Sequence, residues 1–206
     1  GSAKVKDIYA QNPFGVLDPS KPFLPFGPIP EKDAYFIIGS DEIFQKKNAQ
    51  INTNIVWQNL PSSINPNPSV RIEKLQAGTW QNVATETNIF DGINTAITIQ
   101  NDDLSKPNFD GNKAFDVSSR NGFYRFKLNG SFGHAAYQMA LTTYLIDKAK
   151  GNSDKGTILN LIQAYELPSN TPTAENTISA IKSTVYSSII TPPTTPPYTP
   201  NIEEIS

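Results

Sequence analysis

Residues 51–57, Ile51-Asn52-Thr53-Asn54-Ile55-Val56-Trp57, carry the pattern that decides the fold. In an extended chain, Ile51, Thr53, Ile55 and Trp57 fall on one face and the two asparagines fall on the other. This alternation predicts a half-buried β-strand. Because Trp57 shares its face with two isoleucines, we interpret it as a core residue and not as part of a ligand platform.

Similar short segments lie on both sides of this strand. The turn Ala77-Gly78 between two of them predicts a β-hairpin, and Ser40 can cap a single helical turn at 41–46. In 122–128, Tyr124, Phe126 and Leu128 share the inward parity, with Arg125 and Lys127 outward. Further strands are expected at 34–39, 70–75, 79–83, 87–90 and 96–99. Short strands separated by turn signals predict an antiparallel β-sandwich.

The pattern changes to helical after residue 130. Apolar residues then recur at the spacing of one helical stripe, and Gly151 can end that helix. The stripe consists of Ala136, Tyr137, Ala140, Leu141, Tyr144 and Leu145. A second helix is expected from Thr171-Pro172 towards Tyr186, whereas residues 182–190 suit either a helix or a strand. The expected fold class is therefore mainly β with a helical addition (α+β), an antiparallel β-sandwich core followed by one or two helices.

Prolines organise both ends of the chain. Of the 17 prolines, six lie in residues 13–30 and five in residues 191–200. Proline forbids helix, so 13–30 is expected to be an extended strap packed on the core through Phe14, Phe23 and Phe26, and a polyproline ligand for a partner is the alternative. If the strap is instead a tether, those three phenylalanines become interface residues. The candidate interface residues are Phe14, Phe23, Phe26 and Tyr198.

These segments give an expected organisation. Residues 1–2 are typical of the remnant of a removed tag, 3–30 form the strap, and 31–130 form the sandwich core. Residues 131–190 are expected to complete the same domain, followed by an exit segment at 191–206. Residues 201–206 read as an opening strand cut short, which suggests a piece of a longer chain.

Composition excludes several classes of function. The 206 residues carry a net charge of −2 and no cysteine, while 20 Asn and 17 Thr fill the polar quota. Without a basic excess, nucleic acid is not expected as a partner. No window approaches 18 consecutive apolar residues, so membrane insertion is not expected, and the first residues contain no apolar signal-peptide core.

The residues that could support chemistry are few. His134 is the single histidine and lies at the start of a predicted helix, where a packed or capping role is expected. Residues 108–112 have the alternating oxygen spacing of a calcium loop, but Lys113 stands where glycine is needed. Whether the local carboxylates bind a cation is left open; they are Asp102, Asp103, Asp110 and Asp116. We therefore expect no enzyme, no cofactor and no small-molecule substrate.

Several idiosyncratic stretches resemble the large J-like baseplate proteins of phage-tail-like contractile injection systems. Residues 17–28 (LDPSKPFLPFGP) lead to 35–40 (YFIIGS) and 42–44 (EIF), and 55–57 (IVW) precede Leu60-Pro61. Residues 122–126 (GFYRF) with 132–137 (FGHAAY) are similar to the family's "GF.R..L … FGH..Y" element. Residues 196–202 (PPYTPNI) are similar to its exit segment. The pieces occur in the family's order, but the segment before Gly122 and residues 171–190 do not match.

This resemblance implies one internal domain of a baseplate wedge protein. Such a domain would be a non-catalytic assembly domain that binds other baseplate or tail subunits, and its particle would assemble in the cytoplasm. A second hypothesis, which low charge, abundant Asn and Thr and aromatic strands also suit, is a carbohydrate-binding or adhesive sandwich on a cell surface. The proline strap and its matched exit segment favour the first.

Overall fold

The computed structural model describes residues 7–44, 50–100, 114–149 and 190–206. The chain divides into two compact units. The first, here called the sandwich unit, comprises Gly1–His134 with Pro197–Ser206, and the second comprises Ala135–Pro196. This division differs from the expected one, in which residues 131–190 complete a single domain with the core.

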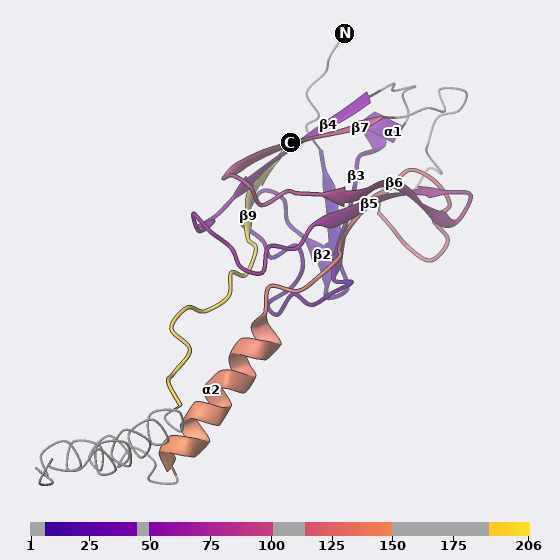
Figure 1. Ribbon diagram of the computed structural model, residues 1–206. Helices are drawn as coiled ribbons and strands as arrows, with labels where there is room; N and C mark the ends of the chain where they lie inside the picture. The colour runs from indigo at the N-terminus through magenta and orange to yellow at the C-terminus, as the bar shows by residue number, and fades with distance from the viewer. Residues whose placement is uncertain (1–6, 45–49, 101–113, 150–189) are drawn as a thin grey trace, which may run out of the picture. The chain divides into compact units, whose positions relative to one another are not determined.

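The sandwich unit contains two antiparallel sheets, as predicted (Figure 1). The larger sheet has the strand order β2-β1-β3-β8-β5-β6 and the smaller one β7-β4-β9. In chain order the strands are β1 (Tyr9–Asn12), β2 (Gly15–Leu17), β3 (Tyr35–Gly39), β4 (Gln50–Trp57), β5 (Val70–Gln76), β6 (Thr79–Thr87), β7 (Asn94–Gln100), β8 (Tyr124–Leu128) and β9 (Ile202–Ile205).

Two helices lie in the described part of the chain. Helix α1 (Asp41–Phe44) is the predicted helical turn. Helix α2 (His134–Ala149) starts at His134, as predicted, and none of its side chains is buried. The expected cap at Gly151, the second helix from Thr171 and nearly all of the ambiguous segment 182–190 lie outside the described residues.

The core forms where the inward faces of the two sheets meet. The predicted parity holds in β4 and β8, with Ile55, Trp57, Tyr124, Phe126 and Leu128 all buried. Aromatic pairs pack in this core: Phe36 of β3 stacks on Phe126 of the neighbouring strand β8 with ring centroids 4.9 Å apart, and the ring of Trp57 on β4 lies 4.8 Å from that of Phe90 in the loop after β6. Alternation thus predicts which residues are buried, because successive side chains of a β-strand point to opposite faces of the sheet.

The strap is part of this core at two of its phenylalanines. The main chain of Phe23 pairs with that of Ile202 in β9 through N–H···O=C bonds of 3.0 and 2.9 Å. Phe26 is 2% exposed and contacts the ring of Phe36 edge-on at 5.3 Å. Packing of the strap is therefore confirmed at Phe23 and Phe26 but is wrong for Phe14, which is 76% exposed.

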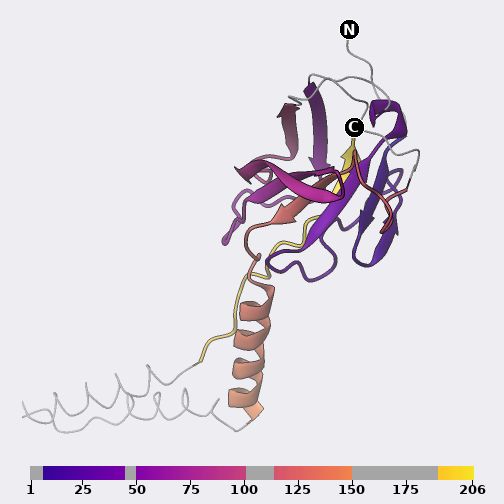
Figure 2. The same cartoon turned by 90° about the vertical axis from the view of Figure 1, so that its right-hand side faces the viewer.

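The structure departs from the expected strands at two places and confirms one further strand. Residues 88–90 are not a strand, because β6 continues to Thr87 and the following loop buries Ile89 and Phe90 directly. The hairpin β1–β2 inside 9–17 was not predicted. The strand expected at 201–206 is present as β9, drawn in yellow at the C-terminus in Figure 2; it pairs with β4 and buries Ile202 and Ile205.

Candidate interaction surfaces

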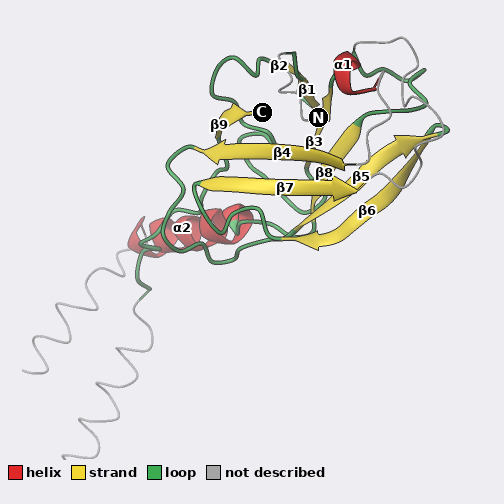
Figure 3. Ribbon diagram, turned by 90° about the horizontal axis from the view of Figure 1, so that it is seen from above, coloured by secondary structure: helices red, strands yellow, loops and turns green. Residues whose placement is uncertain are grey.

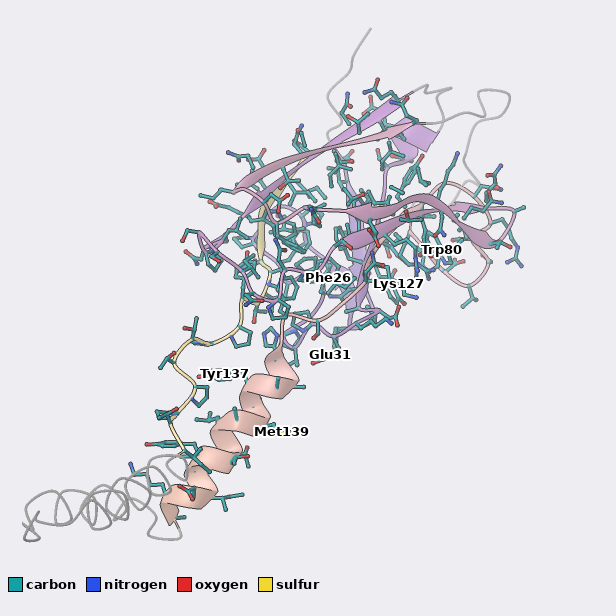
Figure 4. The ribbon with its side chains drawn as sticks, viewed as in Figure 1. Phe26, Glu31, Trp80, Lys127, Tyr137 and Met139 are labelled. Atoms are coloured by element: carbon teal, nitrogen blue, oxygen red, sulfur yellow. The ribbon has the colours of Figure 1, made fainter. Side chains whose placement is uncertain are left out.

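Three of the four predicted interface residues are partly or wholly withdrawn from the surface. Phe23 and Phe26 are buried in the core of the chain; Figure 4 labels Phe26. Their burial follows from their positions opposite β9 and Phe36, because a large aromatic ring gains free energy by leaving water. Tyr198 is half-buried, and Phe14 is exposed to solvent.

Phe14 lies at the turn between β1 and β2, and the sequence there builds a shallow apolar groove. The side chain of Asn12 accepts from the Phe14 N–H at 2.9 Å and donates to the carbonyls of Leu24 and Pro25. This buried amide therefore joins the hairpin to the strap. The groove has a volume of about 290 Å³ and is bordered by Phe14, Val16, Leu17, Leu24 and Pro28. We call it the Phe14 groove.

A glycine keeps the ring of Phe14 against the strap. Gly27 has φ +78°, and a Cβ atom added there would lie 2.4 Å from Cε2 of the Phe14 ring. Val16, on the edge strand β2, is 71% exposed beside the same groove. Together these residues present apolar surface to solvent instead of to the core.

Tyr198 anchors the exit segment to the sandwich unit. Its hydroxyl donates to the main-chain carbonyl of Gln58 at 3.0 Å, and its ring lies edge-on to Phe132 at 6.0 Å. Burial raises the pKa of Tyr198. The residue is thus a structural contact that remains partly open to solvent.

His134 has a packed role, as expected. Its Nε2 lies 2.9 Å from Oγ1 of Thr199, so the side chain joins the start of α2 to the exit segment. Burial lowers the pKa of His134, and the negative charge of Glu31 opposes that effect. Among the described residues, the other ring nitrogen, Nδ1, has no hydrogen-bond partner, so no carboxylate orients the ring.

The two tryptophans are both engaged within the chain. Trp57 is 1% exposed, and its indole N–H donates to the Ile89 carbonyl at 2.6 Å, which confirms it as a core residue. Trp80, labelled in Figure 4, is half-buried, and the Arg125 guanidinium lies 4.4 Å from its ring centroid. Arg125 also donates to Glu73 at 2.6 Å. One face of Trp80 is therefore covered by a cation, which leaves less ring for a sugar.

A second concave surface was missed in the sequence. It lies between β6 and β7, the end strands of the two sheets, which Figure 3 labels. Its volume is about 520 Å³. Its apolar lining is Ile72, Val83, Ala84, Ala96, Ile97 and Ile99, and amide and hydroxyl side chains surround it. We call it the β6–β7 cleft. No local signal could reveal it, because it depends on which strands end each sheet.

Of the four carboxylates considered as possible cation ligands, one lies in the described part of the chain. Asp102, Asp103 and Asp110 lie outside the described residues. Asp116 is described, and its carboxylate accepts from the side chain and main chain of Ser118 and from the main chain of Ser119, contacts that lower its pKa. Among the described residues, no group of three or more His, Asp or Glu side chains is placed to hold a metal ion.

Comparisons with known proteins leave the family open. No protein-family model matches the chain, and no curated protein matches it significantly. In the part of the chain that the structure describes, no helix is long and apolar enough to cross a membrane.

Proposed function

We propose that this chain is a structural assembly domain of the baseplate of a contractile tail or injection system. It acts by protein–protein contact, without catalysis. The resemblance of residues 17–28, 122–137 and 196–202 to J-like baseplate proteins supports the identity of the particle. The observation that carries the mode of action is the apolar surface at the Phe14 groove.

The Phe14 groove has the character of a contact surface. Phe14 and Val16 expose 76% and 71% of their surface beside one groove, on the hairpin that ends the larger sheet. Contiguous exposed apolar side chains mark protein interaction sites, because a partner removes them from water. The missing side chain of Gly27 lets the Phe14 ring lie against the strap, and the Asn12 side chain accepts from the Phe14 main-chain N–H at 2.9 Å.

The surface of α2 is of the same kind. Met139, Leu145 and Ile146 are exposed on this helix, and Figure 4 labels Met139. Of its 16 residues, Asp147 and Lys148 alone carry full charges. A helix this apolar gains stability from contacts with other protein surfaces. The carbohydrate alternative is less favoured, because Trp57 is buried and Trp80 is covered by Arg125 on one face.

The genetic context and particle assembly test the proposal. We expect a sheath or tail-tube gene beside the coding sequence. Phe14→Glu in the full-length gene should abolish assembled particles in negative-stain images, because it places a charge in an apolar contact. Thr85→Glu, at an exposed position of β6, is the matched control and should assemble normally. Normal particles with Phe14→Glu, or glycan-array binding that depends on Trp80, would reject the proposal.

A further inference from the structure

We propose that the β6–β7 cleft receives an extended segment of a partner polypeptide, which adds a strand between β6 and β7. The inference deepens the proposed function and rests on its premise that the chain works by protein contact. It assigns to that contact a place in the fold and a mode of recognition, strand addition.

The first support is that both sides of the cleft are strand edges. β6 ends the six-stranded sheet and β7 ends the three-stranded one, and within the described residues neither outer edge pairs with another strand. Consecutive residues 81–84 and 96–100 line the cleft, so the main chain of both strands borders it. In an antiparallel edge strand, every second residue directs its N–H and C=O outwards. Both edges can therefore bond to an inserted strand.

The second support is that β7 lacks the devices that normally protect an edge. Its seven residues pair with β4 in unbroken register, and its sequence NTAITIQ contains no charge and no proline. By contrast, the pairing of β6 with β5 shifts at two places. Long, regular and uncharged edges recruit other strands unless something covers them. β7 thus has the properties of an edge strand that pairs with a strand of another chain.

The lining defines the chemistry of the occupant. Ile97 and Ile99 are buried alternate residues of β7, which match the two-residue period of apolar side chains on an added strand. Gln81, Asn82, Thr98 and Gln100 offer hydrogen bonds beside them. Among the described residues, Lys74 is the one charged residue of the lining. The occupant is an extended segment with alternating apolar residues.

The size of the cleft is consistent with such a segment. Its volume of about 520 Å³ lies within the roughly 300–1,000 Å³ range of ligand pockets. None of the described residues that line it is aromatic, so they offer a sugar ring no stacking partner. The lining therefore favours a peptide over a glycan.

A peptide selection tests the proposal. The bait is the full chain, and the probe is a phage-displayed library of random nine-residue peptides. Peptides that also bind an Ala96→Lys bait are removed, because this exposed residue lines the cleft on β7. We expect enriched sequences that alternate apolar and polar residues. The best peptide is then synthesised and its affinity is measured by fluorescence polarisation.

Two controls separate strand pairing from other binding. Ala96→Lys should weaken the affinity at least tenfold, while Asn94→Lys, on β7 but outside the cleft, should change it less than twofold. Circular dichroism must show that both variants remain folded. Methylating the amide nitrogen of every second peptide residue should also weaken binding at least tenfold, because it removes main-chain donors.

Each contrary outcome overturns the inference. These outcomes are no enrichment over the Ala96→Lys bait, affinity that survives N-methylation, and glycan-array binding that Ala96→Lys abolishes. The failures of the two proposals are distinguishable. Normal particle assembly with Phe14→Glu rejects the proposed baseplate contact and leaves the peptide result standing, whereas a cleft that binds no peptide leaves the Phe14 result standing.

Discussion

At the scale of the residue, Trp57 connects β4 to the loop that follows β6. Its ring lies at a tilt to that of Phe90, and its indole N–H donates to the carbonyl of Ile89. We expect Trp57→Ala to lower the free energy of unfolding by about 3–5 kcal/mol, because it removes a fully buried aromatic side chain. Urea denaturation followed by circular dichroism measures this.

Trp57→Phe serves as the intermediate control, since it keeps much of the ring but loses the indole donor. Its stability should fall between those of the wild type and Trp57→Ala. A Trp57→Ala protein with an unchanged urea midpoint would contradict the assignment of Trp57 to the core.

The buried hydroxyl of Tyr124 makes the stability of the sandwich unit depend on pH in the alkaline range. Burial raises the pKa of Tyr124 to about 12, whereas an unfolded tyrosine titrates near 10. The folded state therefore keeps this proton to higher pH, so stability is complete below about pH 10 and is lost progressively between about pH 10 and 12. We expect the urea midpoint to fall over that interval, and to fall less in Tyr124→Phe.

The same variant tests the buried hydroxyl at neutral pH. Among the described residues the Tyr124 hydroxyl has no hydrogen-bond partner. Its removal should therefore be neutral or stabilising by up to about 1 kcal/mol. Tyr144→Phe on α2 is the control, and parallel pH curves for the wild type and Tyr124→Phe would refute the prediction.

At the scale of the element, the strap contains its own matched comparison. Phe26 and Phe14 have the same side chain, but the first is 2% exposed and the second 76%. Phe26→Ala should cost about 3–5 kcal/mol of stability, and Phe14→Ala should cost less than about 1 kcal/mol. Thermal melting measures the difference, and equal losses would show that the strap is not packed as described.

The hairpin β5–β6 has a turn that can be improved. Ala77 and Gly78 both have positive φ, at 50° and 78°, the type I′ arrangement in which Asn-Gly is favoured. Alanine is strained at this φ, so Ala77→Asn should raise stability by about 0.5–1 kcal/mol. The melting temperature checks this. A lower value for Ala77→Asn would mean that the turn relaxes to another conformation.

Strand alternation explains which elements could be predicted. In β4 and β8 every inward residue except Thr53 is apolar and most outward ones are polar, so the sequence alone indicates the buried face. β1 and β2 escaped prediction because they have four and three residues, and one of the inward residues of β1 is the polar Asn12. Phe14 was misjudged because proline content indicates an extended path but not which side of it meets the core.

The surfaces were harder to predict than the core. The β6–β7 cleft results from the strand order, which is set by contacts between distant segments. β9, for example, follows β4 by well over a hundred residues and still pairs with it. Short-range patterns do not contain that information.

At the scale of the whole molecule, the second unit interrupts the sandwich unit in sequence. Ala135–Pro196 separates His134 from Pro197, and the side chains of His134 and Thr199 bond to each other. Replacing Ala135–Pro196 by a Gly-Ser linker of about eight residues should leave a folded sandwich, because the entropy of closing a loop changes by only about 0.6 kcal/mol for each doubling of its length. A cooperative melt with the strand spectrum of the parent checks this, and an unfolded product would show that the sandwich depends on its insertion.

Because β9 pairs with β4, the smaller sheet cannot be completed until the end of the chain has been translated. At a translation rate of about 5–20 residues per second, roughly seven to thirty seconds separate the emergence of Trp57 from that of Ile202. During that interval the nascent chain holds β4 without the strand that covers its side, and Phe23 without its bridging partner. During this interval a chaperone, or a partner protein translated nearby, can bind the nascent chain at the position that β9 later occupies.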